Sequence, residues 1–293
     1  MNNSPIFIIG AGRSGTNILR DALSSMPGIV TWPCDEINLV FRHGNRTMKH
    51  DEFEIEHATP GVKKYIRHTF KKLENQFPEN RVLEKTCANS LRVPFLNEIF
   101  PEAKFIFIAR NGYDVTASAA KRWTSSIELS YLLKKLKFVP KSDIPYYVLR
   151  FIKNRWKQMF SEDKRMATWG PIYPGMEADA KSLSLEEVCA KQWARCVVKA
   201  NDDLNKIESN RVYKLDYESF VSSPKQYISE IGGWLGYTWD DEDIAASVKD
   251  VRTGSVGKGL KDIEADKKAN LDSIISPVMN SVYKQITSDV SGN

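Results

Sequence analysis

The chain has 293 residues, 42% of them hydrophobic, which is enough for one large α/β domain or two small ones. Its formal net charge of +5 and isoelectric point near 8.8 suit a polyanionic small molecule but exclude the dense basic character of a dedicated nucleic-acid binder. No apolar run approaches the length of a bilayer span and no secretory leader precedes residues 5–9, so we expect a cytoplasmic protein with no stable membrane insertion.

The cysteines of the chain are scattered and form no CxxC pair. They are Cys34, Cys87, Cys189 and Cys196. This pattern indicates neither a disulfide framework nor a zinc site, so we expect no metal and a reducing environment.

Five short stretches of apolar and β-branched residues are typical of buried parallel strands. In chain order they are residues 5–9, 29–32, 81–85, 103–109 and 211–215. Helical periodicity follows the first stretch over residues 14–26 and the third over residues 89–100. Strands that alternate with helices predict an α/β fold, with a parallel sheet covered by helices on both faces.

The middle of the chain differs in composition from the rest. Between about residues 123 and 175 it is rich in aromatic and basic residues, and its helical stretches are broken at Pro140, Pro145 and Pro171. We expect a helical insertion here, roughly residues 124–190, over the carboxyl edge of the sheet. No internal repeat or linker divides the chain, so a single domain over residues 1–293 is expected.

A glycine-rich turn, Gly10-Ala11-Gly12-Arg13-Ser14-Gly15-Thr16, lies between the first predicted strand and the first predicted helix. Backbone N–H groups in such a turn, at the N-terminus of a helix, bind anions whatever the chemistry that follows. Arg13 adds a cation to the turn. The sequence therefore predicts that this turn holds the phosphates of a nucleotide.

Two common nucleotide-binding motifs fit the turn only in part. It matches GxGxxG, with Asp35 or Glu36 near the place of a ribose-binding acid, but Trp32-Pro33-Cys34 separates that acid from its strand. It also approaches a Walker loop, but Thr16 stands where the lysine is needed and Asn17 where the metal-binding hydroxyl is needed. Both a dehydrogenase and a nucleoside-triphosphate hydrolase are thus disfavoured.

The whole turn resembles the 5′-phosphosulfate loop of sulfotransferases that use 3′-phosphoadenosine 5′-phosphosulfate (PAPS), in the branch with Arg-Ser-Gly-Thr rather than a lysine. Residues 105–110 resemble the second signature of that family, a strand that ends in an arginine, here Arg110; Asp114 and then Ser118 follow on the next helix. In the family this arginine and serine hold the 3′-phosphate. An arginine at a strand end and a hydroxyl two helical turns later can converge on one phosphate dianion.

Three further segments are similar to the same family. Leu83-Glu84-Lys85-Thr86 resembles a strand that ends in Lys-Thr-Pro, with Cys87 in place of the proline. Arg252 and residues 255–259 resemble the late loop that closes on the nucleotide, and residues 215–218, Pro224 and 234–236 resemble the late strand and its following helix. The resemblance implies a three-layer fold like that of P-loop NTPases. It also implies a nucleotide site made of Gly12, Arg13, Ser14, Gly15, Thr16, Asn17, Arg110, Ser118, Val256, Gly257 and Lys258.

The function implied is transfer of a sulfuryl group from PAPS to an acceptor hydroxyl on a small molecule, carbohydrate or glycoconjugate. The reaction needs one base and fixed cations but no metal. Arg13 is the best candidate for the cation at the leaving oxygen, with Lys85 second. Glu36 is the preferred base because it follows the second predicted strand, while Asp35 and His43 stay open as alternatives.

Two other functions remain open at this point. One is a magnesium-dependent nucleotide phosphotransferase, and the other is a nucleotide-binding module without turnover. We assign no site role to the tryptophans Trp123, Trp156, Trp169 and Trp193, because most tryptophans of this kind belong to the core.

Overall fold

The computed structural model describes residues 4–123, 143–146, 148, 149, 152, 169–259 and 265–291. Most of the expected insertion, including residues 124–142, Trp156 and residues 153–168, lies outside the described residues.

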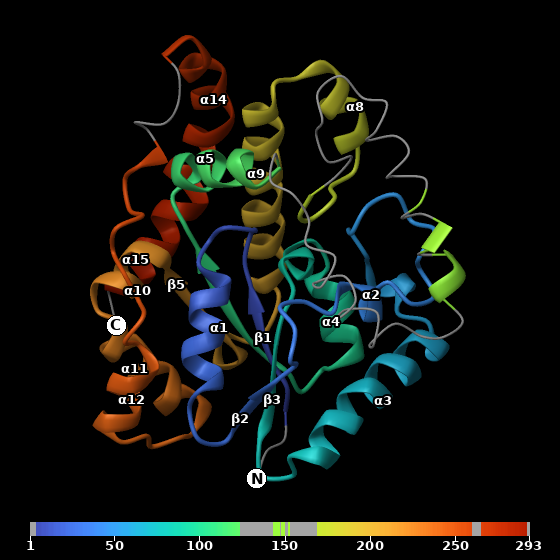
Figure 1. Cartoon of the computed structure of the whole chain (residues 1–293), viewed down its shortest axis with the longest axis vertical. Coiled ribbons are helices and arrows are strands. Elements are labelled where there is room, and N and C mark those ends of the chain that lie inside the picture. Colours follow the sequence, from blue (N-terminus) through green and yellow to red (C-terminus); the bar gives the residue numbers. More distant parts are fainter. Residues whose placement is uncertain are drawn as a thin grey trace.

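A parallel five-stranded sheet forms the centre of the protein (Figure 1). Its strands are β1 (Ile6–Ile9), β2 (Ile29–Thr31), β3 (Arg81–Lys85), β4 (Lys104–Ala109) and β5 (Val212–Asp216). They lie in the order β2-β3-β1-β4-β5, so the first strand is the central one. The α/β class and the five predicted strands are confirmed, with bounds that differ by one residue at most at either end.

Helices cover both faces of the sheet (Figure 1). One layer consists of α1 (Thr16–Ser24), α10 (Tyr217–Ser222), α11 (Pro224–Leu235) and α12 (Asp241–Ser247). The other contains α3 (Pro60–Gln76), α4 (Val93–Ile99), α5 (Gly112–Trp123), α9 (Leu185–Leu204) and α14 (Ala265–Val278). The remaining described helices are α2 (Asn38–Phe41), α8 (Met176–Ser182) and α15 (Lys284–Ser291), with single turns at Ile55–His57, Cys87–Leu91, Ser209–Arg211 and Met279–Tyr283.

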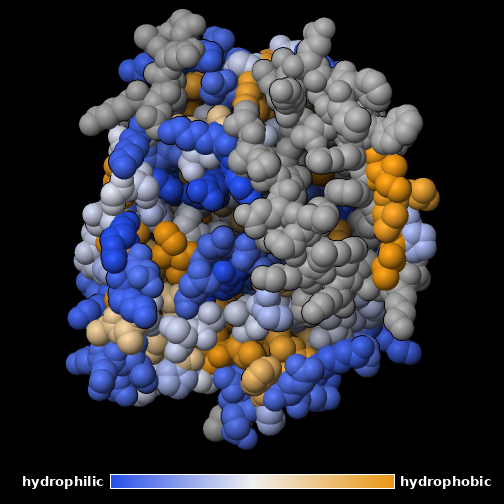
Figure 2. All heavy atoms as spheres, viewed as in Figure 1, coloured by the Kyte–Doolittle hydropathy of each residue, from blue (hydrophilic) through white to orange (hydrophobic). Residues whose placement is uncertain are grey.

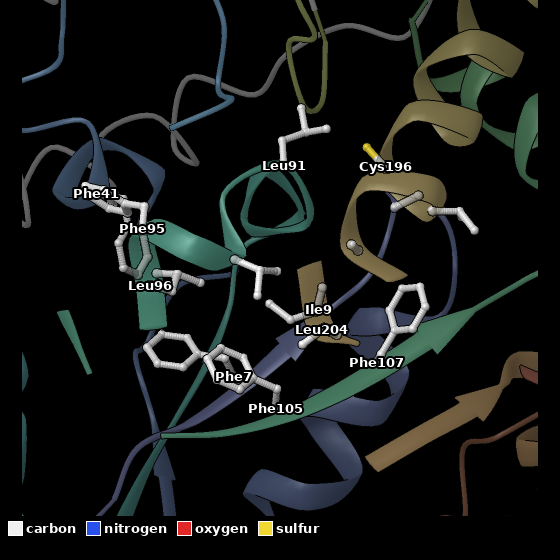
Figure 3. Packing of buried hydrophobic residues seen from close by; sticks show 14 of the residues in the cluster. Phe7, Ile9, Phe41, Leu91, Phe95, Leu96, Phe105, Phe107, Cys196 and Leu204 are labelled. Atoms are coloured by element: carbon white, nitrogen blue, oxygen red, sulfur yellow. The ribbon is translucent and has the colours of Figure 1, made fainter. Parts of the chain in front are cut away.

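Side chains of each central strand alternate between two cores, because successive residues of a strand point to opposite faces. In β1, Phe7 and Ile9 enter the core under α3, α4 and α9, whereas Ile6 and Ile8 enter the core under α1 and α11. Figure 3 shows the first of these cores, where Phe7 and Ile9 lie with Phe105 and Phe107 of β4 against residues of α4 and α9. All four side chains are fully buried, and each contributes roughly 2–3 kcal/mol.

The predicted helix over residues 89–100 is interrupted in the structure. A 3₁₀ turn over Cys87–Leu91 ends at Arg92, and α4 begins at Val93 with Pro94 in its first turn. Arg92 is fully buried and its guanidinium donates to Asn89 Oδ1 (2.8 Å) and Asn38 Oδ1 (2.7 Å). Arg92 has a non-helical backbone and makes these buried hydrogen bonds. The spacing of apolar residues carries no information about such bonds.

Hydrophilic residues cover most of the coloured surface in Figure 2, and hydrophobic residues reach this face in separate groups. Within the described ranges, no helix is both long enough and apolar enough to cross a bilayer.

Candidate active site

Three strands bring the predicted site residues to one edge of the sheet. Because the strands are parallel, with Ile8 beside Lys85 and Ile9 beside Phe107, the carboxyl ends of β1, β3 and β4 lie together. The glycine turn follows β1, Lys85 ends β3, and Arg110 follows β4 directly. Ligands bind at this edge in open parallel sheets.

Left-handed backbone conformations shape the glycine turn. Arg13 has φ of 72° and Gly15 has φ of 86°, and the N–H of Ser14 donates to the carbonyl of Ala11 (3.2 Å). A Cβ on Gly15 would lie 2.2 Å from a ring carbon of Tyr217, so the position requires glycine for space as well as for conformation. Arg13 adopts the same region with a side chain, at a cost of about 1–2 kcal/mol. Such strain is typical of a ligand-binding turn.

The N-terminus of α1 is suited to an anion. The helix begins at Thr16, directly after the turn, with no side-chain cap and no acidic residue in its first turn. Its first N–H groups therefore keep their positive partial charge at the turn. Thr16 is buried there, whereas Asn17 is exposed on the first turn.

Two buried polar atoms at the turn have no hydrogen-bond partner among the described residues. They are Ser14 Oγ, in a residue with no exposed surface, and Arg110 Nε. Unpaired buried donors cost free energy, and a bound phosphate or sulfate oxygen would satisfy both kinds of group. The residues present thus fit a phosphorylated ligand.

Arg13, Arg110 and Ser118 come together beside the turn. Arg13 Nε donates to Ser118 Oγ (2.9 Å), and Arg110 donates to the carbonyl of Arg13 (3.1 Å). Burial lowers the pKa of Arg13, and the nearby cations Arg122 and Arg110 lower it further. Arg13, Arg110 and Arg122 thus lie together where the sequence places the 3′-phosphate, and Asp114, 3.6 Å from Arg110, offsets part of their positive charge.

The late loop lies against the same group of residues. Arg110 donates to the carbonyl of Ser255 (2.7 Å), and the N–H groups of Gly257 and Gly259 donate to Asp114 (2.8 and 2.6 Å). Val256 and Lys258 are exposed on this loop. The turn after β1, the strand end after β4 and the loop before residue 260 are thus joined through Arg110 and Asp114.

Glu36 and Lys85 form an ion pair on the other side of the turn. Lys85 Nζ lies 3.0 Å from Glu36 Oε1, which also accepts from the N–H of Cys87 (3.3 Å). Lys85 is buried, and burial alone would lower its pKa, but the Glu36 carboxylate outweighs this effect and raises it. Lys85 is therefore charged.

Cys87 connects this pair to the glycine turn. Its Sγ lies 3.7 Å from the hydroxyl of Thr16, within hydrogen-bond distance for sulfur. Burial raises the pKa of the Cys87 thiol to about 12, so the thiol is neutral. The residue that stands in place of the proline of the resembling motif thus contacts both the turn and Glu36.

The two alternative bases have other partners. Asp35 is 45% exposed on its side chain and lies 3.4 Å from Arg20, so the adjacent acids Asp35 and Glu36 diverge. His43 Nδ1 lies 2.9 Å from the buried carboxylate of Asp143, and its ring packs on Tyr65. Of the three, only Glu36 is paired with Lys85 at the end of β3 in the part of the chain that the structure describes. The structure describes no cluster of three or more His, Cys, Asp or Glu side chains that could hold a metal ion.

Two residues that lie beside the site have no role in the prediction from the sequence. Arg122 lies one helical turn after Ser118 on α5, and this i+4 spacing could have suggested it. Trp169, treated as a core residue, has ring atoms 3.2 Å from where a Cβ on Gly12 would lie. No local signal relates Trp169 to a turn more than 150 residues earlier.

Solved structures resemble the fold along nearly the whole chain. A sulfotransferase from Alicyclobacillus acidocaldarius matches with a TM-score of 0.53 at 16% identity, covering 97% of this chain and 96% of that one. The sulfotransferase domain from the curacin biosynthetic pathway matches with a TM-score of 0.52 at 15% identity, covering 98% and 97%. A mouse sulfotransferase complexed with PAP (3′-phosphoadenosine 5′-phosphate) matches with a TM-score of 0.51 at 13% identity, covering 95% of this chain and 85% of that one. At these identities the likeness shows the fold.

Sequence comparison adds a relative and a family. An uncharacterized protein of Aquifex aeolicus (strain VF5) is 22% identical over 302 residues, which cover 94% of this chain and 32% of that protein. The chain thus spans about a third of the length of this relative. A family model described as the sulfotransferase family matches residues 5–159. Since this match covers more than half of the 293 residues, the chain belongs to the sulfotransferase family.

Proposed function

We propose that this protein is a PAPS-dependent sulfotransferase that transfers a sulfuryl group to an acceptor hydroxyl. The observation that carries the proposal is the convergence of Arg13, Arg110 and Ser118 beside the anion-binding turn. A 3′-phosphate distinguishes PAPS from ATP, AMP and NAD, and a nucleotide without it would lack the charged contact that Arg110 and Ser118 offer.

The residues of the chain divide into a binding group and an activating group. The N–H groups of the turn, Ser14 and Thr16 would hold the 5′ end of the nucleotide, and Arg110 with Ser118 would hold its 3′-phosphate. PAPS supplies the sulfuryl group. Arg13 has its backbone in the turn and its Nε on Ser118 (2.9 Å), so it joins the sites for the two ends of the nucleotide. We assign its positive charge to the leaving phosphate oxygen, where it would stabilise the transition state.

Glu36 would act as the base. Its carboxylate takes the proton of the acceptor hydroxyl as the acceptor oxygen bonds to sulfur, and the bond from sulfur to the phosphate oxygen breaks. Lys85 holds Glu36 in place through the 3.0 Å ion pair. We place the acceptor on a carbohydrate or glycoconjugate, on the basis of the arginine-type turn and the basic, aromatic composition between residues 123 and 175.

A ligand comparison in the presence of a chelator tests the proposal. PAP, the desulfated product of PAPS, should raise the melting temperature more than AMP, ATP or NAD at equal concentration, because only PAP engages Arg110 and Ser118. Transfer of labelled sulfuryl from PAPS to a panel of hydroxyl acceptors should proceed with the chelator present. No preference for PAP, or turnover that vanishes with the chelator and returns with magnesium, would instead support a phosphotransferase. PAP binding without transfer to any acceptor would support the non-catalytic alternative.

A further inference from the structure

Glu84, on β3 next to Lys85, is a buried carboxylate that the proposed chemistry does not use. Its side chain is 1% exposed, and both carboxylate oxygens accept short hydrogen bonds. A buried acid is costly to keep unless its hydrogen bonds serve the structure around it. The destinations of these bonds therefore indicate what Glu84 does.

One path from Glu84 leads to the backbone after Glu36. The hydroxyl of Thr86 donates to Glu84 Oε1 (2.5 Å) and accepts from the N–H of Ile37 (3.2 Å). A hydroxyl has a single proton, and Thr86 gives it to Glu84. The oxygen of Thr86 is therefore left to accept from the N–H of Ile37.

A second path leads to the next residue, Asn38. The amide of Asn89 donates to Glu84 Oε2 (2.6 Å), and Arg92 joins Asn89 Oδ1 (2.8 Å) to Asn38 Oδ1 (2.7 Å). The two paths thus end on the two residues that follow Glu36. Glu84, Thr86, Asn89 and Arg92 are all buried, so solvent does not compete for these bonds.

The segment that carries Glu36 is irregular backbone, so side chains from other elements hold it: Arg20 donates to the carbonyl of Asp35 (3.2 Å), and Ile37 is buried in the core. It lies between β2 and α2, and Ile37, at the start of α2, has a non-helical backbone and no side-chain cap. A catalytic group on such a loop needs surrounding hydrogen bonds to hold it within about 0.5 Å of its working position.

We propose that Glu84 is a positioning residue for the catalytic base Glu36, and this inference rests on the proposed function. Through Thr86 it fixes the backbone of Ile37, and through Asn89 and Arg92 it fixes Asn38. Lys85 acts on the Glu36 carboxylate itself, so the two neighbours on β3 hold the base by different means.

Only the ionised form of Glu84 accepts at both oxygens, because protonation turns one acceptor into a donor. The groups that face it are Arg92 and Lys85, which favour ionisation, Glu36, which opposes it, and Thr86. Burial is the largest influence and raises the pKa of Glu84 to about 7. One of the two paths should weaken as Glu84 takes up a proton.

Exchanging the groups at positions 84 and 89 gives a sharp test. In Glu84→Gln the new amide faces the amide of Asn89, and the second path breaks. In the double variant Glu84→Gln/Asn89→Asp, the amide introduced at position 84 can donate to the carboxylate introduced at position 89, and Arg92 can donate to the same carboxylate. The negative charge then lies on residue 89 instead of residue 84, and the hydrogen bonds of both paths are restored.

We expect Glu84→Gln to lower kcat by about 10-fold to 100-fold, the scale of a misplaced catalytic group, with the Kd for PAP unchanged within about twofold. The acidic limb of the kcat profile near pH 7 should disappear. The double variant should recover most of the lost kcat, and Glu98→Gln, a partly exposed acid on α4, should behave as the parent chain.

A kcat in Glu84→Gln equal to that of the parent, or a double variant that recovers thermal stability but not kcat, would overturn the inference. If Glu84→Gln does not fold, recovery in the double variant decides the question. A parent chain that transfers no sulfuryl group from PAPS would overturn the proposed function, and this inference with it. An active parent with an equally active Glu84→Gln would overturn this inference alone.

Discussion

Replacing Arg110 with alanine should remove the preference of the protein for a 3′-phosphate. The guanidinium donates to the carbonyls of Arg13 (3.1 Å) and Ser255 (2.7 Å) and lies 4.4 Å from the centroid of the Tyr217 ring. Its Nε is buried without a partner among the described residues, so this donor remains for a ligand.

The magnitude follows from the bonds that Arg110 makes. A hydrogen bond from a charged donor contributes about 1.5–3 kcal/mol, so losing the bond to a 3′-phosphate should weaken PAP binding by about 10-fold to 150-fold. Ser118 offers a neutral hydroxyl, so Ser118→Ala should weaken PAP binding by about 0.5–1.5 kcal/mol. AMP has no 3′-phosphate, and its affinity should change much less in both variants.

Titration calorimetry with PAP and AMP on the parent and both variants measures this difference. The ratio of the two affinities removes general effects of the substitution on the fold. Arg211→Ala is a matched control, because Arg211 also bonds a backbone carbonyl, that of Ala103 (2.9 Å), but at the amino end of β4. It should lower stability without changing the ratio.

An unchanged ratio of PAP to AMP affinity in Arg110→Ala would refute the reasoning. In that case Arg110 would serve only to join the turn to the late loop, through Arg13 and Ser255. An equal fall in both affinities would have the same meaning, because AMP shares only the 5′ end of the nucleotide.

Three further substitutions probe the base, the turn and the buried acid. Glu36→Gln should lower kcat by about 100-fold to 10,000-fold and leave PAP binding unchanged by calorimetry, because a neutral amide cannot accept the proton; normal turnover would remove Glu36 from the mechanism. Gly15→Ala should destabilise the fold by roughly 2–4 kcal/mol in denaturant unfolding, from its φ of 86° and the contact with Tyr217, whereas Gly61→Ala, with no atom near the added Cβ, should be harmless. The pKa of Glu84, about 7 against an ordinary 4.5, means that the folded chain binds a proton between these values that the unfolded chain releases. The contribution of Glu84 to stability therefore falls as pH rises, and the stability of Glu84→Gln relative to the parent should improve by about 2–3 kcal/mol from pH 5 to pH 8; a constant difference would contradict the burial of an acid there.

The central strands β1 and β4 could be predicted because they are buried on both faces and therefore read as continuous apolar runs. The same property leaves open which core each side chain enters, since Ile6 and Phe7 are equally apolar although they enter different cores. The order β2-β3-β1-β4-β5 depends on contacts between distant segments. It required the structure.

The site divides in the same way between local and distant information. The glycine turn and the spacing of Arg110 and Ser118 are local patterns, and their chemistry could be inferred from the sequence. The ion pair between Lys85 and Glu36 joins residues 49 positions apart, and no local pattern distinguishes Glu36 from Asp35. The position of Lys85 at the end of β3 makes that distinction, because Lys85 pairs with Glu36 whereas Asp35 lies near Arg20.

The strand order accounts for how binding and activation are separated. The central strand β1 carries the turn, β4 on one side carries Arg110, and β3 on the other side carries Lys85 with its partner Glu36. In-line displacement needs the leaving oxygen and the attacking oxygen on opposite sides of the transferred group. A nucleotide held by the turn and by Arg110 would present its reactive end toward β3, where the base lies. The β4 side holds Arg13, Arg110 and Arg122, which would pair with the nucleotide, whereas on the β3 side Glu36 pairs with Lys85. The placement of β1 between β3 and β4 therefore keeps the base apart from the cations that bind the nucleotide.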